Sequence, residues 1–192
     1  KVRGMFAIVI WDKIKKNLIL IRDRVGQKPL YYGLVNGNFI FSSELKFFNK
    51  ILYSKPKLNL HAASLMIEYG YVPTPLSIYH DIYKLEQGGM VIYSAQNNKI
   101  EKNIWWSKKN LNNKYFFENS DFNEILTNAV REQMISDVPI GAFLSGGLDS
   151  TLIVSILQRL SSNKIKTFTV GFDQNEYNES IKAKKIANYL GT

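Results

Sequence analysis

The sequence predicts two portions of different fold class: an α+β portion with mostly antiparallel sheets, then the first βαβα elements of an α/β doubly wound portion. Residues 1–106 hold short apolar runs bounded by turn residues, which is typical of antiparallel strands. Residues 121–192 alternate helical patterns with short apolar runs, which is typical of a parallel sheet covered by helices. Residues 107–120 are polar and show little periodicity, so we predict a linker between two domains there.

Six strands are expected in the front portion. They are expected at residues 5–11, 18–21, 30–35, 38–42, 90–93 and 99–106. A polar turn joins the first pair into a hairpin, and Asn36-Gly37, a strong signal for a two-residue type I′ turn, joins the second pair. A short helix is expected to begin at 44–48. A longer helix follows the N-cap residue Asn59 and ends at Gly70.

The rear portion begins with an amphipathic helix and continues as strand, loop, helix, strand, helix. Apolar residues fall on one face of the first helix, namely Phe122, Ile125, Leu126, Ala129, Val130 and Met134. Asp121 and Glu124 predict a weak capping box at its start. The later elements are expected as strands at 139–144 and 165–171, a loop at 145–150, and helices at 151–160 and 177–190.

Composition excludes several classes of protein. With 192 residues, 45% of them hydrophobic, the chain has material for one or two packed domains and is not intrinsically disordered. It has no Cys, so these residues provide no disulfide, no Cys-type zinc site and no thiol nucleophile. No apolar run approaches the ~20 residues of a membrane span and no signal-peptide pattern is present, so we expect a cytoplasmic protein. Because the sequence starts at Lys1 and only two parallel strands are expected, we expect an internal fragment of a longer protein.

The formal net charge of +9 raises the question of nucleic-acid binding. Residues 1–106 carry 15 basic and 7 acidic side chains, whereas residues 121–192 carry 7 and 8. The basic residues of the front portion are scattered singly or in pairs, and they form no dense stripe with interleaved aromatic residues. A solvated basic surface is therefore the favoured interpretation, and we expect no nucleic-acid partner.

The S-G-G-L-D-S motif at 145–150 carries the chemistry of the sequence. It lies between a predicted buried strand and a predicted helix, where ligands bind in open α/β sheets. Gly146 and Gly147 let the backbone approach an anion closely, and Ser145 and Ser150 add hydroxyl donors. The carboxylate of Asp149 would repel a phosphate unless a cation lay between them, which indicates Mg²⁺. The Walker A pattern is absent, so the motif indicates a different loop for pyrophosphate with Mg²⁺.

This motif resembles the signature of the PP-loop ATP pyrophosphatase superfamily, and its surroundings resemble the bacterial B type of glutamine-hydrolysing asparagine synthetase. In the rear portion the similar segments are D-V-P-I-G-A-F-L-S-G-G-L-D-S at 137–150, K-T-F-T-V-G-F-D at 166–173 and the segment 177–192. In the front portion the similar segments are 3–7, 22–32, 42–46 and 69–79. The resemblance therefore covers both portions in order, with a glutaminase-like part at 1–106 and the start of a synthetase domain at 121–192.

The resemblance implies an Ntn-hydrolase-like class II glutaminase portion followed by a PP-loop synthetase portion. In that family a Cys near the N-terminus releases ammonia from glutamine, and the ammonia passes through an internal tunnel. ATP activates aspartate as β-aspartyl-AMP, which the ammonia converts to asparagine with release of AMP; pyrophosphate leaves in the activation step. The implied small-molecule partners are glutamine, aspartate and ATP, the implied cofactor is Mg²⁺, and a homodimer is compatible with the family. No membrane partner is implied.

The resemblance assigns no glutaminase catalytic residue to this chain, because the nucleophilic Cys is expected upstream. It assigns ATP and pyrophosphate binding to Ser145, Gly146, Gly147, Asp149 and Ser150, with Asp149 as the Mg²⁺ ligand. Phe143 and Val170 match positions that contact ATP in the family, but the sequence alone equally allows core strand residues there.

Other polar and aromatic residues are expected to have structural roles. We expect Arg22, Asp23 and Arg24 to pair their charges around the turn at 26–29. Tyr31 and Tyr32 are expected in sheet packing. His61 and His80 occur in unrelated contexts and predict no metal site.

Three alternatives stay open at this stage. A related amidotransferase could act on another carboxylate, such as a cell-surface sugar or a β-lactam precursor, because acceptor residues lie mostly beyond residue 192. An RNA-modifying PP-loop enzyme is disfavoured by the glutaminase-like front portion. A non-catalytic relative is disfavoured by the intact motif at 145–150.

Overall fold

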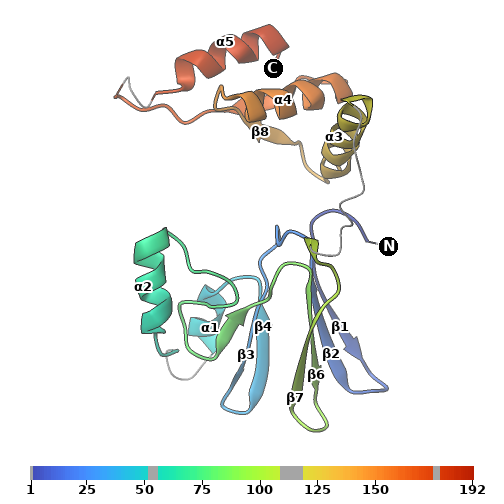
Figure 1. Cartoon of the computed structure of the whole chain (residues 1–192), viewed down its shortest axis with the longest axis vertical. Coiled ribbons are helices and arrows are strands. Elements are labelled where there is room, and N and C mark those ends of the chain that lie inside the picture. Colours follow the sequence, from blue (N-terminus) through green and yellow to red (C-terminus); the bar gives the residue numbers. More distant parts are fainter. Residues whose placement is uncertain (1, 52–55, 109–118, 175–177) are drawn as a thin grey trace. The chain divides into compact units, whose positions relative to one another are not determined.

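The computed structural model describes residues 2–51, 56–108, 119–174 and 178–192 (Figure 1). The chain divides into two compact units, of which unit 1 is Lys1–Asn113 and unit 2 is Lys114–Thr192. Among the described residues, no helix combines the length and the apolar character that crossing a membrane requires.

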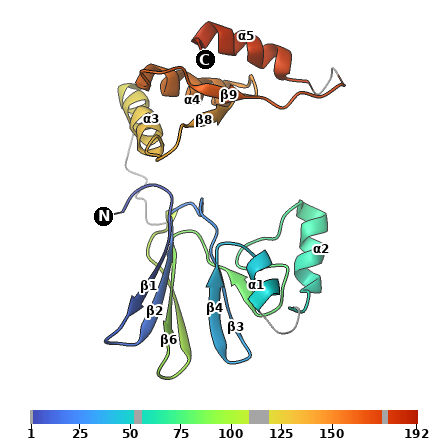
Figure 2. The same cartoon turned by 180° about the vertical axis from the view of Figure 1, so that it is seen from behind.

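Two antiparallel sheets and two helices make up the part of unit 1 that the structure describes. The first sheet has the strand order β1-β2-β6-β7, with bounds Ala7–Asp12, Asn17–Arg22, Gly89–Ser94 and Lys99–Ile104. The second has the order β4-β3-β5, with bounds Asn38–Ser42, Tyr31–Val35 and Ile82–Lys84. Helices α1 (Lys46–Ile51) and α2 (Leu60–Tyr69) lie beside the second sheet in both opposite views (Figures 1 and 2).

Local signals set the ends of several elements of unit 1. Asn36 and Gly37 both have positive φ, of 52° and 78°, which confirms the predicted type I′ turn. The side chain of Asn59 accepts a hydrogen bond from the N–H of Ala62 at 3.1 Å and so caps α2, as predicted. Gly70 ends α2 in the left-handed conformation. Strand β5 was not predicted, because three residues are too few to show a period.

The core of unit 1 joins its two sheets. Its buried residues are Leu20, Leu30, Tyr32, Leu85 and Val91. Phe39 of β4 stacks on Tyr93 of β6 with 4.4 Å between ring centroids, and Tyr32 of β3 lies 6.0 Å from Phe39. Aromatic contacts therefore connect the sheets next to the aliphatic core.

The described residues of unit 2 form a parallel pair of strands and three helices. Its elements are α3 (Asn119–Gln133), β8 (Gly141–Phe143), α4 (Leu148–Leu160), β9 (Lys166–Phe168) and α5 (Ser180–Leu190). Strands β8 and β9 pair in parallel, which confirms the predicted arrangement. Two small cores hold the helices together: one around Val130, Ile156, Leu157 and Ile165, and one around Leu144, Val154 and Ala183.

The structure corrects two predicted boundaries in unit 2. Helix α3 begins at Asn119, so Asp121 lies in its first turn rather than before it, and the last two residues of the predicted linker belong to the helix. Most of the predicted linker lies outside the described residues. Helix α4 begins at Leu148 rather than at Thr151, because Gly147 is its N-cap residue. Asp149 and Ser150 therefore belong to the first helical turn instead of a loop.

Candidate functional site

The S-G-G-L-D-S segment follows the carboxyl end of β8 and leads directly into α4. The N–H of Leu144 donates to the carbonyl of Phe168 at 2.9 Å, and the hydroxyl of Thr169 donates to the carbonyl of Leu144 at 2.6 Å. Leu144 is buried in the second core of unit 2. The start of the segment is therefore fixed to the neighbouring strand at the edge of the sheet where open α/β folds bind ligands.

Gly146 brings this segment close to α5. It has a φ of 80°, a left-handed conformation that residues with a side chain rarely adopt. A Cβ atom added at Gly146 would lie 3.2 Å from the backbone nitrogen of Ala183 and 3.3 Å from Cγ of Lys182. The first turns of both α4 and α5 thus lie at this loop, and helix N-termini favour bound anions.

Gly147 is the N-cap residue of α4 and makes no side-chain capping bond. The first N–H groups of a helix have no partner inside the helix, so they are satisfied by a cap, by water or by a ligand. The carbonyl of Gly147 accepts from both the N–H and the hydroxyl of Thr151, at 3.1 and 2.7 Å, and these bonds hold the first turn in shape. An added Cβ at Gly147 would meet only Ser145 Oγ, at 3.4 Å.

The two serines of the motif bond to each other across the loop. Their hydroxyl oxygens lie 2.9 Å apart, and the N–H of Ser145 lies 3.3 Å from Ser150 Oγ. The N–H of Gly147 donates to Ser145 Oγ at 3.3 Å. Hydroxyl groups therefore accept from backbone N–H groups at the positions where a phosphate oxygen would accept them.

Asp149 lies in the first turn of α4, and its side chain is exposed. Within the described ranges, no group of three or more His, Asp or Glu residues could hold a metal ion. A lone exposed carboxylate suits Mg²⁺, which is commonly bound by one or two carboxylates, substrate phosphate oxygens and water. The exposed carboxylate of Asp149 therefore fits such an ion.

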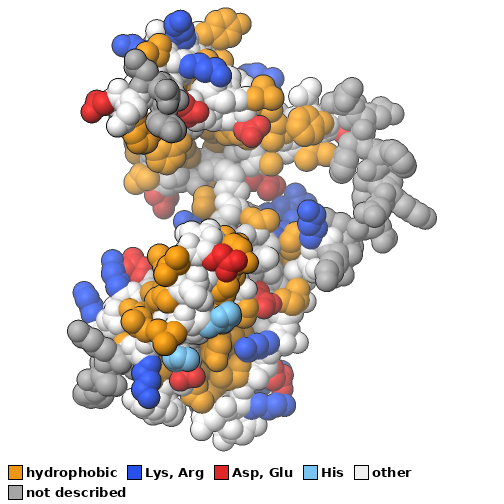
Figure 3. Space-filling view, turned by 60° about the vertical axis from the view of Figure 1, so that its left-hand side comes forward, with side chains coloured by type: hydrophobic (Ala, Val, Ile, Leu, Met, Phe, Trp, Pro, Cys, Tyr) orange, Lys and Arg blue, Asp and Glu red, His pale blue; other side chains and the backbone are white. Residues whose placement is uncertain are grey.

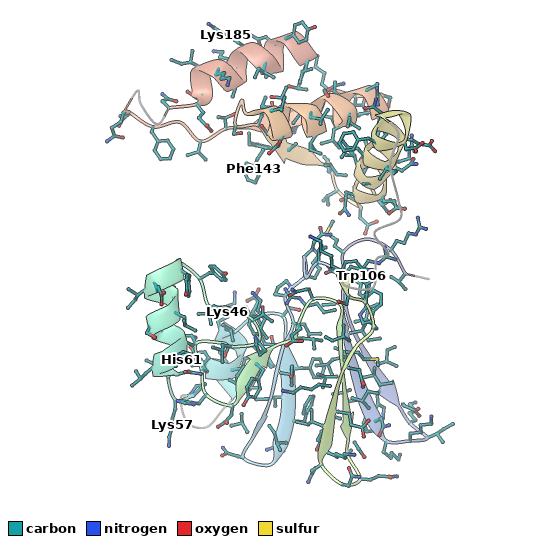
Figure 4. All side chains as sticks on the ribbon, viewed as in Figure 1. Lys46, Lys57, His61, Trp106, Phe143 and Lys185 are labelled. Atoms are coloured by element: carbon teal, nitrogen blue, oxygen red, sulfur yellow. The ribbon has the colours of Figure 1, made fainter. Side chains whose placement is uncertain are left out.

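Phe143 and Val170 lie at and just beyond the carboxyl ends of the two paired strands. Phe143 is the last residue of β8 and is 81% exposed, and Val170 follows β9 and is 65% exposed. Figure 4 shows Phe143 projecting from β8 away from α4 and α5. Neither residue is buried among the described residues of unit 2.

Arg22 and Asp23 have a structural role, as predicted, but their hydrogen bonds go to the backbone. The three guanidinium nitrogens of Arg22 donate to the carbonyls of Lys28, Leu85 and Gly26. The carboxylate of Asp23 accepts from four backbone N–H groups, those of Phe6, Val25, Gln27 and Lys28. Burial disfavours the charged carboxylate, but the four N–H donors outweigh it and lower the pKa of Asp23.

The remaining residues singled out in the sequence lie apart from the loop. Arg24 lies over the ring of Trp106, with 6.0 Å between the guanidinium carbon and the ring centroid. Tyr32 is buried in the core of unit 1. His61 and His80 are exposed, and the space-filling view shows histidine side chains at the surface of unit 1 (Figure 3). They belong to no metal-binding group among the described residues.

Sequence reasoning missed Lys182 and Thr169. Thr169, just after β9, donates its hydroxyl to the carbonyl of Leu144, and Lys182 of the neighbouring helix lies where a Cβ atom added at Gly146 would come within 3.3 Å of its Cγ. A lysine in an amphipathic helix gives no local signal of such a contact. The contact depends on Ala183, which is buried and holds the first turn of α5 against the second core of unit 2.

Two family models match this chain. Residues 1–106 match the model described as a glutamine amidotransferase domain, and residues 121–192 match the model described as asparagine synthase. Fold and matches together define a glutamine amidotransferase portion joined to an asparagine synthase portion. The chain belongs to the family of glutamine-hydrolysing asparagine synthetases.

Of three curated relatives, two are named asparagine synthetases. The chain is 37% identical over 98% of its length to a protein of Methanocaldococcus jannaschii named putative asparagine synthetase [glutamine-hydrolyzing] 2. It is 34% identical over its whole length to asparagine synthetase [glutamine-hydrolyzing] 1 of Bacillus subtilis. It is 26% identical over 98% of its length to a Gibberella zeae protein named amidase chry2. The chain spans 38%, 30% and 30% of the lengths of these relatives.

Proposed function

We propose that the protein containing this chain makes asparagine from aspartate, with ammonia released from glutamine and with ATP split to AMP and pyrophosphate. In this proposal residues 1–106 belong to an Ntn-type glutaminase domain, 107–120 form a linker, and 121–192 begin a PP-loop synthetase domain. The observation that carries the proposal is the loop at 145–147, where a helix N-terminus without a side-chain cap follows a parallel strand in a chain of this family.

In this proposal, the loop binds the phosphates of ATP through backbone N–H groups. The N–H of Gly147, which donates to Ser145 Oγ in the present structure, turns to a phosphate oxygen. Ser145 and Ser150 exchange their mutual bond for bonds to the same anion. Phe143 and Val170, exposed beside the loop, contact the nucleoside. Nucleotide binding thus replaces hydrogen bonds that the loop now makes with itself, at small structural cost.

Asp149 is the residue that would hold Mg²⁺. Bound Mg²⁺ supplies positive charge that offsets the charge developing on the pyrophosphate leaving group. Asp149 is exposed in the first turn of α4, so its carboxylate can reach an ion shared with phosphate oxygens. Activation is needed because a carboxylate is a poor electrophile with a poor leaving group. Adenylation of the aspartate β-carboxylate forms a mixed anhydride, which ammonia attacks while AMP departs.

A second candidate is amide formation on a different carboxylate. The relatives include a protein named as an amidase rather than as an asparagine synthetase, so the family contains differently named members. In both candidates the loop contacts the phosphates of ATP and not the acceptor carboxylate. The loop therefore does not discriminate between the two candidates. Measuring the exchange of pyrophosphate into ATP with a panel of carboxylic acids in place of aspartate separates the two candidates.

The test is exchange of labelled pyrophosphate into ATP, dependent on aspartate, in the whole natural polypeptide that contains this chain. Asp149→Ala is expected to lower the exchange rate at least about a hundredfold, because the change removes the metal-binding carboxylate. Glu124→Ala, which removes an exposed carboxylate from α3 of the same unit, should leave the rate unchanged. An Asp149→Ala protein that exchanges at the wild-type rate would exclude a catalytic role for this loop.

A further inference from the structure

Lys182 lies over the glycine of the loop, although it belongs to a different element. It is in the first turn of α5, and a Cβ atom added at Gly146 would lie 3.3 Å from its Cγ and 3.4 Å from its Cδ. Gly146 itself is buried and has a left-handed backbone conformation, so Lys182 lies beside a well-defined part of the loop. The methylene stem of Lys182 therefore lies beside Gly146.

The position of Lys182 is set by its neighbour in the chain. Ala183 is 1% exposed and packs with Leu144 and Val154, so the first turn of α5 is held on the same core as the strand before the loop. Lys182 itself is exposed. Lysine side chains commonly pack their methylene stem on a surface and keep the ammonium group in water. The ammonium group is two bonds beyond Cδ, the atom that would lie 3.4 Å from a Cβ added at Gly146.

The loop lacks a basic side chain of its own. Among residues 145–150 the only charged side chain is the carboxylate of Asp149. The ion pairs found among the described residues are Lys46–Glu44 and Lys99–Glu101, so Lys182 is not neutralised by a described carboxylate. A polyphosphate bound here would meet helix N-termini, a metal held by Asp149, and the ammonium group of Lys182. Lysine suits phosphate as a compact point charge.

We propose that Lys182 binds the terminal phosphates of ATP and the pyrophosphate that leaves, a role that rests on the proposed function of the loop. The pyrophosphate group gains negative charge as it departs from the α-phosphate. A cation that contacts it stabilises the transition state more than the bound ATP. Lys182 is therefore a phosphate-binding residue provided by α5, whereas a Walker A loop provides a lysine from within the loop itself.

The test compares two lysines of α5 in the whole natural polypeptide. Lys182→Met keeps the length of the stem and removes the charge. Lys184→Met makes the same change in net charge, but residue 184 lies about 200° around the helix from residue 182. Lys182→Arg keeps the charge. The affinity for inorganic pyrophosphate with Mg²⁺ is measured by calorimetry, and pyrophosphate–ATP exchange is measured beside it, after circular dichroism shows equal helix content.

The expected result is about tenfold weaker pyrophosphate binding and slower exchange for Lys182→Met, with near wild-type values for Lys182→Arg and Lys184→Met. Wild-type affinity in Lys182→Met would overturn the assignment, and so would an equal loss in Lys184→Met or Lys182→Arg. If Asp149→Ala abolishes exchange while Lys182→Met changes nothing, only the role of Lys182 fails. If the wild-type polypeptide neither binds nor exchanges pyrophosphate, the proposed function of the loop fails, and the role of Lys182 with it.

Discussion

Replacing Asp23 by Asn tests the buried turn that supports unit 1. The Asp23 side chain is fully buried, and its two oxygens divide four backbone donors between them. Oδ1 accepts from the N–H groups of Val25 and Gln27 at 3.2 and 2.9 Å, and Oδ2 accepts from Lys28 and Phe6 at 2.9 and 3.4 Å. In Asp23→Asn an NH₂ group takes the place of one oxygen, so two buried N–H donors face another donor.

The loss of folding free energy expected for Asp23→Asn follows from these bonds. A buried donor left without an acceptor costs about 1–3 kcal/mol, and bonds to a charged acceptor lie toward the upper part of that range. The two lost bonds therefore predict a loss of about 3–5 kcal/mol, a large part of the ~5–15 kcal/mol by which domains are stable. With a urea slope of about 1.5 kcal/mol per molar, the unfolding midpoint of unit 1 should fall by about 2 M or more.

Tryptophan fluorescence follows this transition, because Trp11, Trp105 and Trp106 are the only tryptophans of the chain and all precede residue 107. Trp105 is close to the change, since its ring N–H donates to the carbonyl of Arg22 at 3.0 Å. Asp12→Asn is the matched control. Asp12 accepts from two N–H groups through one oxygen, Oδ1, so the amide oxygen of Asn can keep both bonds.

An Asp23→Asn protein that unfolds at the same urea concentration as Asp12→Asn would contradict this account of the turn. The pH dependence gives a second check. Because the folded pKa of Asp23 lies below its usual value, its stabilisation is present above pH ~4 and is lost as the pH falls through the folded pKa. If the stability rose as the pH fell through this range, the lowered pKa of Asp23 would be contradicted.

Two further predictions concern packing and burial. Gly146→Ala and Gly191→Ala both place a side chain at positive φ, but the new Cβ meets the backbone nitrogen of Ala183 at 3.2 Å in the first and nothing within 4 Å in the second. Thermal unfolding should therefore show Gly146→Ala to be the more destabilised, and equal midpoints would contradict the close approach of α5. Burial, together with Glu86 and Tyr83, raises the pKa of Tyr32 to about 12, so one tyrosine should ionise near pH 12 in an absorbance titration and Tyr32→Phe should remove it. Since this pKa is raised above the ordinary value of 10.0, the contribution of neutral Tyr32 to folding stability is complete below pH ~10 and is lost above it.

Elements with local signals could be predicted from the sequence. The turn at Asn36 and Gly37, the cap at Asn59 and the end of α2 at Gly70 each depend on a residue whose own conformation or side chain decides the structure. The strand before the motif could be predicted because it is apolar and is followed directly by glycines.

Features that depend on distant contacts could not be predicted. Strand β5 exists because it pairs with β3, and Arg22 reaches the carbonyl of Leu85, 63 residues further along the chain. The start of α4 was placed too late because Gly147 caps it without a side-chain signal. Lys182 reaches the loop only through the packing of Ala183, which no local pattern of α5 indicates.

The central claim is that the S-G-G-L-D-S segment at 145–150 begins a synthetase site that splits ATP between its α- and β-phosphates. The direct measurement is the nucleotide product, analysed by chromatography, when the whole natural polypeptide is incubated with ATP, Mg²⁺, aspartate and glutamine. The account predicts AMP and pyrophosphate in equal amounts with asparagine, and no product with Asp149→Ala. Formation of ADP and phosphate, or of asparagine without AMP, would contradict it.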